Sequence, residues 1–168
     1  MPEPGDYACV QIPWVKFRGM RVPNLIGYAI RLFTWSKYDH AIVYLGNGLI
    51  AEAQPKGARI SFLNEYDGDA IVWSHDALTA EQREEIIAVA QAYAIAKVPY
   101  GFLDIAYLGL ARIGFKPAWL LRYVEDERRL ICSQLVALCG QRAGVDSWLC
   151  GQPNACLVKP SDLARRIK

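Results

Sequence analysis

The sequence predicts an α+β fold in which a mostly antiparallel sheet packs against helices. One observation is the order of its patterns: an alternating segment, a helical segment, four short β-rich segments, and then helical segments alone. A second is HAIVYLGNGLIAEAQ (residues 40–54), where two apolar runs flank Gly-Asn-Gly, the pattern of a β-hairpin. A third is that 168 residues, 53% hydrophobic and 21% charged, suit one globular domain over residues 1–168.

The first half of the chain supplies the predicted strands. GDYACVQI (5–12) alternates and is rich in β-forming residues, so it predicts a strand. VPNLIGYAIRLFTWS (22–36) spaces its apolar residues as a helix does, with Asn24 as the N-cap. After the hairpin, GARISFL (57–63) and DAIVWS (69–74) predict two further strands.

The second half of the chain predicts helices, in the segments 79–96, 102–124, 132–144 and 159–167. The first begins with a capping box formed by Thr79 and Gln82, and a proline at position 99 ends it. The second is interrupted near the proline at position 117. The last is a short helix for which we expect Ser161 to be the cap.

Charge and hydropathy exclude several classes of protein. The net charge of +2 gives no argument for nucleic-acid binding, and no nucleic-acid-binding motif occurs. The first 14 residues lack the continuous apolar core of a signal peptide. The most apolar later stretch (101–115) is broken by Asp104 and Arg112, so it is too short and too charged to span a bilayer. We therefore expect a protein made in the cytoplasm, with neither a signal peptide nor a transmembrane helix.

The five cysteines are Cys9, Cys132, Cys139, Cys150 and Cys156. Their odd number, in a chain without an export signal, argues against a framework of disulfides. Their spacings do not match those of zinc-binding pairs, so we expect no metal site and no cofactor. Most should be small buried hydrophobic residues, and Cys139, among apolar neighbours, is assigned to the core.

Cys132 directly precedes an apolar run with helical spacing, in LICSQLVALCG (130–140). At the first turn of a helix, the dipole and the unpaired N–H groups favour a thiolate, so this position suits a nucleophile as well as a core thiol. A nucleophile would also need an imidazole and a polar group that orients it. Of the two histidines, His75 lies in a polar segment typical of a loop or cap, whereas His40 begins an otherwise apolar strand.

Glu52 is unusual because it lies within the apolar strand GLIAEAQ, where a carboxylate is costly unless it has partners. A two-residue turn at Asn47-Gly48 would place Glu52 and His40 on opposite faces of the hairpin. A three-residue loop would place His40 on the same face, opposite Gln54 and diagonal to Glu52. The sequence leaves the register open, and with it whether Glu52 or Gln54 orients His40.

Several segments together resemble the circularly permuted branch of the NlpC-type papain-like cysteine peptidases, which includes the lecithin:retinol acyltransferase-like proteins. They are GDYACV, SKYDHAIVYLGNGLIAEA, VPYGF, ICSQLVALCGQRAG and VKPSDLARR, and the combination of DHAIVYLG, AEA and CSQLV is the most specific. The resemblance implies a papain-like fold with the nucleophile at a helix N-terminus. It implies Cys132 as nucleophile, His40 as general base and acid, Glu52 as third residue, and a Tyr100 hydroxyl beside the nucleophile. Residues 102–124 depart from the compact family pattern.

Three functions follow as hypotheses. The first is a cysteine hydrolase (amidase or endopeptidase) with a Cys-His-Glu site, acting on peptidoglycan peptides. Without a signal peptide, it could reach the bacterial cell wall within a virion, as part of a phage tail or another delivery machine. The other proteins of that assembly would then be its partners. The second is a lipid acyltransferase or deacylase, in which residues 102–124 contact a membrane instead of forming an ordinary buried helix. The third is a non-catalytic structural module of an assembly.

Overall fold

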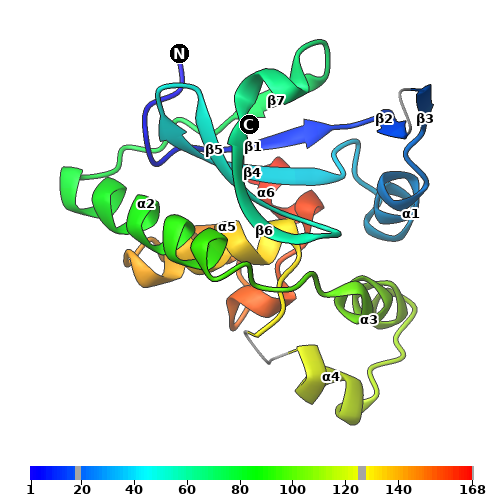
Figure 1. Cartoon of the computed structure of the whole chain (residues 1–168). Helices are drawn as coiled ribbons and strands as arrows, with labels where there is room; N and C mark the ends of the chain where they lie inside the picture. Colours follow the sequence, from blue (N-terminus) through cyan, green and yellow to red (C-terminus); the bar gives the residue numbers. More distant parts are fainter. Residues whose placement is uncertain (18–19, 125–127, 168) are drawn as a thin grey trace.

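The computed structural model describes residues 1–17, 20–124 and 128–167, and its centre is a five-stranded sheet (Figure 1). The strand order is β6-β5-β4-β1-β7, and every neighbouring pair is antiparallel. The strands are β1 (Tyr7–Gln11), β4 (His40–Gly46), β5 (Leu49–Gln54), β6 (Gly57–Phe62) and β7 (Ala70–Trp73). This confirms the predicted α+β class with an antiparallel sheet.

Helices α2 and α5 cover one face of this sheet, and α3 and α4 lie beyond its end, with α3 between α1 and α4 (Figure 1). The helices are α1 (Leu25–Thr34), α2 (Ala80–Ile95), α3 (Phe102–Arg112), α4 (Ala118–Val124), α5 (Cys132–Arg142) and α6 (Pro160–Arg166). Short 3-10 turns occur at η1 (Leu63–Tyr66), η2 (Asp146–Leu149) and η3 (Ala155–Leu157). The predicted break in the 102–124 region is confirmed, because α3 and α4 are separate helices.

The two faces of the sheet bury different side chains. The larger cluster joins the face under α2 and α5 to those helices, and Cys139 lies fully buried within it. The smaller cluster, on the opposite face, includes Val10, Ile42 and Tyr66. Because successive residues of a strand point to opposite faces, His40 shares the face of the smaller cluster with Ile42.

Two of the three predicted helix caps are confirmed. The Asn24 side chain accepts the Gly27 N–H at 2.9 Å, and the Thr79 capping box is formed. The prediction for Ser161 is wrong, because α6 begins at Pro160, two residues earlier than a Ser161 cap implies, with Lys159 as the capping residue. Proline has a backbone conformation suited to the first helical position, and this places Ser161 inside the helix.

A second, two-stranded sheet was not predicted. It consists of β2 (Trp14–Phe17) and β3 (Met20–Pro23), which pair antiparallel just before α1. Strands of four residues are too short to show a clear alternation in the sequence. Among the helices of the described residues, none has both the length and the apolar character needed to cross a bilayer.

Candidate active site

The β4–β5 hairpin combines the two registers that the sequence left open. Gly46 pairs with Leu49 across a two-residue turn, whose residues both have positive φ (53° and 76°). A bulge just before Gly46 then shifts the register, so that Ile42 pairs with Glu52. The turn is therefore the two-residue type, but the bulge brings His40 to the same face as Glu52.

His40 and Glu52 form a buried pair at this end of the sheet. His40 Nε2 lies 2.7 Å from Glu52 Oε2, His40 is 6% exposed and Glu52 is fully buried. Burial alone would lower the pKa of His40, but hydrogen bonds to Cys132 and Glu52 and the charges of both raise it to about 10. Burial would raise the pKa of Glu52, but its hydrogen bonds and the imidazolium charge lower it to about 2. At neutral pH the pair is an imidazolium and a carboxylate.

Four further side chains donate hydrogen bonds to the Glu52 carboxylate. Oε1 accepts from Ser61 Oγ at 2.6 Å and from Arg59 Nε at 2.9 Å. Oε2 accepts from Gln54 Nε2 at 3.1 Å and from the Tyr66 hydroxyl. A buried carboxylate is stable only when its oxygens are satisfied in this way, so the carboxylate is fixed in both position and charge.

Glu52, and not Gln54, is the residue that contacts His40. The Gln54 amide instead donates to Glu52 and, at 3.0 Å, to the Tyr66 hydroxyl. Sequence reasoning missed Arg59, Ser61 and Tyr66. A signal for Arg59 was present, because Arg59 pairs directly with Glu52 when the β5–β6 hairpin is given a two-residue turn. Tyr66 could not be found in this way, because it lies on η1, outside the strand register.

Cys132 is the first residue of α5, as predicted, and is 1% exposed. The helix start is fixed by the Gln134 side chain, which accepts the Ile131 N–H at 2.8 Å and donates to the Cys156 carbonyl at 2.7 Å. The thiol is close enough to the His40 ring to be one of the groups that raise the pKa of His40. Its sulfur also lies 3.9 Å from the carbonyl oxygen of Asp39, at the start of β4.

Tyr100 completes the set of predicted residues that the structure brings together. Its backbone forms an isolated parallel bridge with Leu130, two residues before Cys132. Burial, followed by the charges of Cys132, Asp104 and Asp39, raises the pKa of the Tyr100 hydroxyl well above its usual value. The hydroxyl therefore stays protonated and can donate a hydrogen bond beside the thiol.

A small, mainly apolar cavity adjoins the sulfur, between α1, α3 and the start of α5. Its lining comes from Ile30, Tyr100, Ile105, Leu108, Ile131, Cys132 and Pro160. Asp39 helps to hold α1 over this site, because its carboxylate lies 3.4 Å from Arg31 Nη1 and 3.4 Å from Asn24 Nδ2. Since Cys132 is almost fully buried, a substrate reaches the sulfur only when some of these side chains move.

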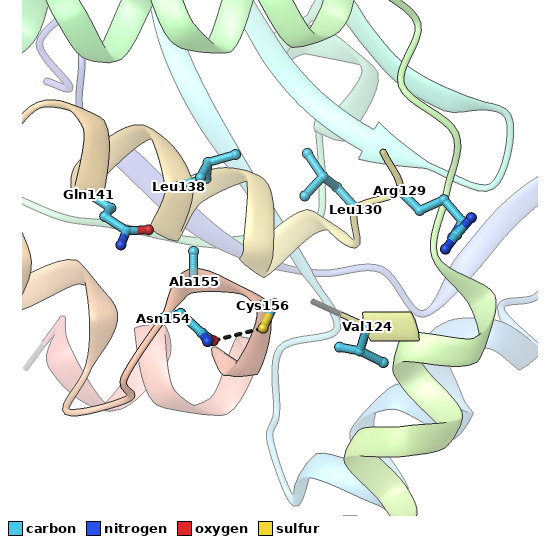
Figure 2. A pocket seen from close by; sticks show the side chains of 8 residues that line it. All are labelled: Val124, Arg129, Leu130, Leu138, Gln141, Asn154, Ala155 and Cys156. Atoms are coloured by element: carbon cyan, nitrogen blue, oxygen red, sulfur yellow. Dashed lines mark hydrogen bonds between the residues drawn. The ribbon is translucent and has the colours of Figure 1, made fainter. Parts of the chain in front are cut away.

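A larger cavity of about 200 Å³ lies along α5, on the other side of Leu130. Figure 2 shows its lining: Val124, Arg129, Leu130, Leu138, Gln141, Asn154, Ala155 and Cys156. Here Cys156 Sγ lies 2.7 Å from Asn154 Oδ1. None of the four candidate catalytic residues lines this cavity, so it is separate from the site at Cys132.

No protein-family model matches the chain, and no curated protein sequence matches it. Among residues 1–17, 20–124 and 128–167, no group of three or more His, Cys, Asp or Glu side chains is placed to hold a metal ion. Function is therefore inferred from the side chains of the site. A thiol at a helix N-terminus, an imidazole and a buried carboxylate are arranged as the parts of a nucleophilic triad.

Proposed function

We propose that this protein is a thiol-dependent hydrolase with a permuted NlpC-type papain-like fold, in which Cys132, His40 and Glu52 are the catalytic residues. The observation that carries the proposal is the buried 2.7 Å contact between His40 and Glu52, made by an imidazole whose pKa is also raised by the Cys132 thiol. A cysteine that only fills the core needs no such partners. A buried, fully hydrogen-bonded His–carboxylate pair suits the orientation and charge stabilisation of a catalytic imidazolium.

In the first half of the reaction, the Cys132 thiolate attacks the carbonyl carbon of an amide. Because Nε2 of His40 is engaged by Glu52, Nδ1 is the nitrogen that serves the sulfur and the substrate. The oxyanion is stabilised by the backbone N–H of Cys132 and by the Tyr100 hydroxyl. The C–N bond then breaks, the leaving amine takes the Nδ1 proton of the imidazolium, and a thioester remains on Cys132.

In the second half, water attacks the thioester carbonyl and gives a proton to the neutral His40 ring. The C–S bond breaks, a carboxylic acid leaves, and the thiolate and imidazolium are restored. Throughout both steps Glu52 keeps the ring in one orientation and balances its positive charge. Arg59, Ser61, Gln54 and Tyr66 act as positioning residues, because they hold the carboxylate and do not touch the reacting atoms.

We propose peptidoglycan peptides as the substrate, on the resemblance to the NlpC-type peptidases, within a phage tail or another delivery machine. One observation favours lipid acyl transfer or deacylation as a second candidate. The side chains around the cavity beside Cys132, including Ile30, Ile105 and Leu108, are mostly aliphatic, as an acyl chain requires, and the cavity of about 10 Å³ would admit such a chain once they move apart.

The test is digestion of purified peptidoglycan, with mass analysis of the fragments, by the wild type, Cys132→Ala and Cys156→Ala. We expect the wild type and Cys156→Ala to cleave an amide bond and Cys132→Ala to be inactive. Parallel reactions measure fatty acid release from phospholipid vesicles. Thiol-dependent product in the vesicle reactions alone would assign the lipid function. If Cys132→Ala matches the wild type in both, or neither substrate is cleaved, the hydrolase proposal fails and the structural-module hypothesis stands.

A further inference from the structure

Helix α1 carries apolar side chains on two opposite sides, and one of these sides faces solvent. Leu25, Tyr28 and Leu32 on the helix, and Trp35 at its C-cap, are spaced by three or four residues and so lie on one side. These four side chains are between 58% and 76% exposed. The opposite side of the helix carries Ile30, which is buried and lines the cavity beside Cys132.

The neighbouring segment from α3 to α4 also exposes apolar side chains. Helix α1 packs on α3, and α3 packs on α4. In Figure 1 the β2–β3 hairpin, α1, α3 and α4 follow one another along one side of the molecule, away from α2. Phe102, Ile113, Phe115 and Trp119 are exposed there. We call these four residues and the four of α1 the apolar cap surface. Exposed apolar side chains gathered on neighbouring helices are typical of an interaction site.

The same segments are basic and nearly free of acids. Residues 12–38 contain five Lys or Arg (16, 18, 21, 31 and 37) and no Asp or Glu, and residues 105–124 contain three (112, 116 and 122) and again no acid. Lys37, Lys116 and Arg122 are exposed. Asp39 and Asp104, which border these segments on one side, are buried. Glu125 directly follows the second segment. Because the whole chain carries only +2 and residues 12–38 carry five basic residues without an acid, the remainder is net acidic and the positive charge is concentrated in the segment that contains α1.

The geometry points to an anionic lipid bilayer as the partner of the apolar cap surface, with α1 lying at the level of the headgroups. Aromatic and aliphatic side chains beside Lys and Arg are the combination that binds such interfaces. A second copy of this chain fits less well, because two such basic surfaces would repel one another. The buried sides of α1 and α3 line the cavity beside Cys132, so docking would bring the site next to the membrane. This inference goes beyond the proposed hydrolase activity and does not depend on it.

The experiment is flotation of the protein with vesicles of phosphatidylcholine, pure or containing about 30% phosphatidylserine. We expect binding to the anionic vesicles, at least tenfold weaker binding to the neutral ones, and loss of binding in high salt. The double variant Tyr28→Glu/Leu32→Glu should lower the partition coefficient more than about 100-fold, because it removes two apolar contacts and adds two repelled charges. The matched control is Ile60→Glu/Phe62→Glu, on the edge strand β6, where both residues are also exposed.

The control variant should bind as the wild type does, and thermal melting should show that both double variants are folded. Cys132→Ala should bind normally, so failure of the hydrolase proposal would leave this one intact. The proposal is overturned if the wild type does not float with anionic vesicles, or if the two double variants lose binding equally. It is also overturned if the wild type forms a stable dimer that Tyr28→Glu/Leu32→Glu dissociates, because the surface would then pair with a second copy.

Discussion

The substitution Glu52→Gln tests the centre of the proposed mechanism, because it removes the charge of the carboxylate at nearly constant shape. In the structure both carboxylate oxygens accept hydrogen bonds, two at Oε1 and three at Oε2, counting His40. A glutamine side chain has one oxygen and an NH₂ group in place of the two oxygens. The groups that donate to either Oε1 or Oε2 would therefore face the NH₂ group, which is itself a donor. The imidazolium of His40 also loses its negative partner.

The expected effect can be worked from these contacts. A hydrogen bond to a charged group contributes about 1.5–3 kcal/mol, against about 1 kcal/mol for a neutral one. A unit charge about 4 Å from the imidazolium contributes up to about 4 kcal/mol more at an effective dielectric constant near 20. We therefore expect the pKa of His40 to fall below its value of about 10 and turnover to fall about 10²- to 10⁴-fold.

The assay is hydrolysis of nitrophenyl butyrate across pH, with iodoacetamide labelling of Cys132 measured by peptide mapping. The alkaline limb of the pH profile should move to lower pH in Glu52→Gln, because the imidazolium loses its proton more easily. The matched control is Glu65→Gln, which removes another carboxylate bound to Arg59, at 2.6 Å, but does not touch His40. This control should keep both the turnover and the pH profile of the wild type.

Two results would refute this reasoning. If Glu52→Gln kept full turnover and the alkaline limb of the wild type, the site would reduce to a Cys132–His40 pair. If Gln54→Ala were the more damaging change, Gln54 would be the residue that orients the ring. We expect Gln54→Ala to be mild, because its amide contacts Glu52 and Tyr66 and leaves the His40–Glu52 bond in place.

Three further outcomes are expected. Tyr100→Phe should lower turnover about 10- to 100-fold with an unchanged melting temperature, because it removes an oxyanion donor and keeps the ring; equal loss of stability and activity would contradict this. Gly140→Ala should lower the free energy of unfolding in urea by about 1–3 kcal/mol, since an added Cβ would lie 2.7 Å from the buried Trp148 side chain; a more stable variant would show that Trp148 can move. The raised pKa of His40 should contribute stability that is complete below pH 6.5 and is lost as pH rises through about 10. The lowered pKa of Glu52 should contribute stability that is complete above pH 4.5 and is lost as pH falls through about 2. Urea unfolding at a series of pH values measures both, and an equal alkaline loss of stability in Glu52→Gln would contradict the assignment to the pair.

Local sequence determined most of the secondary structure. The Asn24 cap, the Thr79 capping box, the turn after Gly46 and the start of α5 at Cys132 all depend on residues within a few positions of one another. Such short-range preferences act before any tertiary contact forms, so they can be predicted from the chain. The Ser161 cap failed where two local preferences competed, since a proline also favoured the first position of the helix.

The residue types of the site were predictable, but their assembly was not. Cys132 meets the start of β4 across a separation of 93 residues, which no local pattern records. Whether His40 faces Glu52 depended on one bulge, because a shift of one residue in register moves every side chain to the other face of a strand. The further donors to the Glu52 carboxylate on β6 and η1 then followed from how the sheet is completed.

Helix α1 shows the same division between sequence and tertiary structure. Its apolar spacing predicted a helix, and spacing alone identifies which side chains share a side. Spacing does not say which side is buried, because burial depends on what packs against the helix. Only the tertiary structure places Ile30 beside the thiol of Cys132 and leaves Leu25, Tyr28 and Leu32 facing solvent, since α3 packs against the helix from one side.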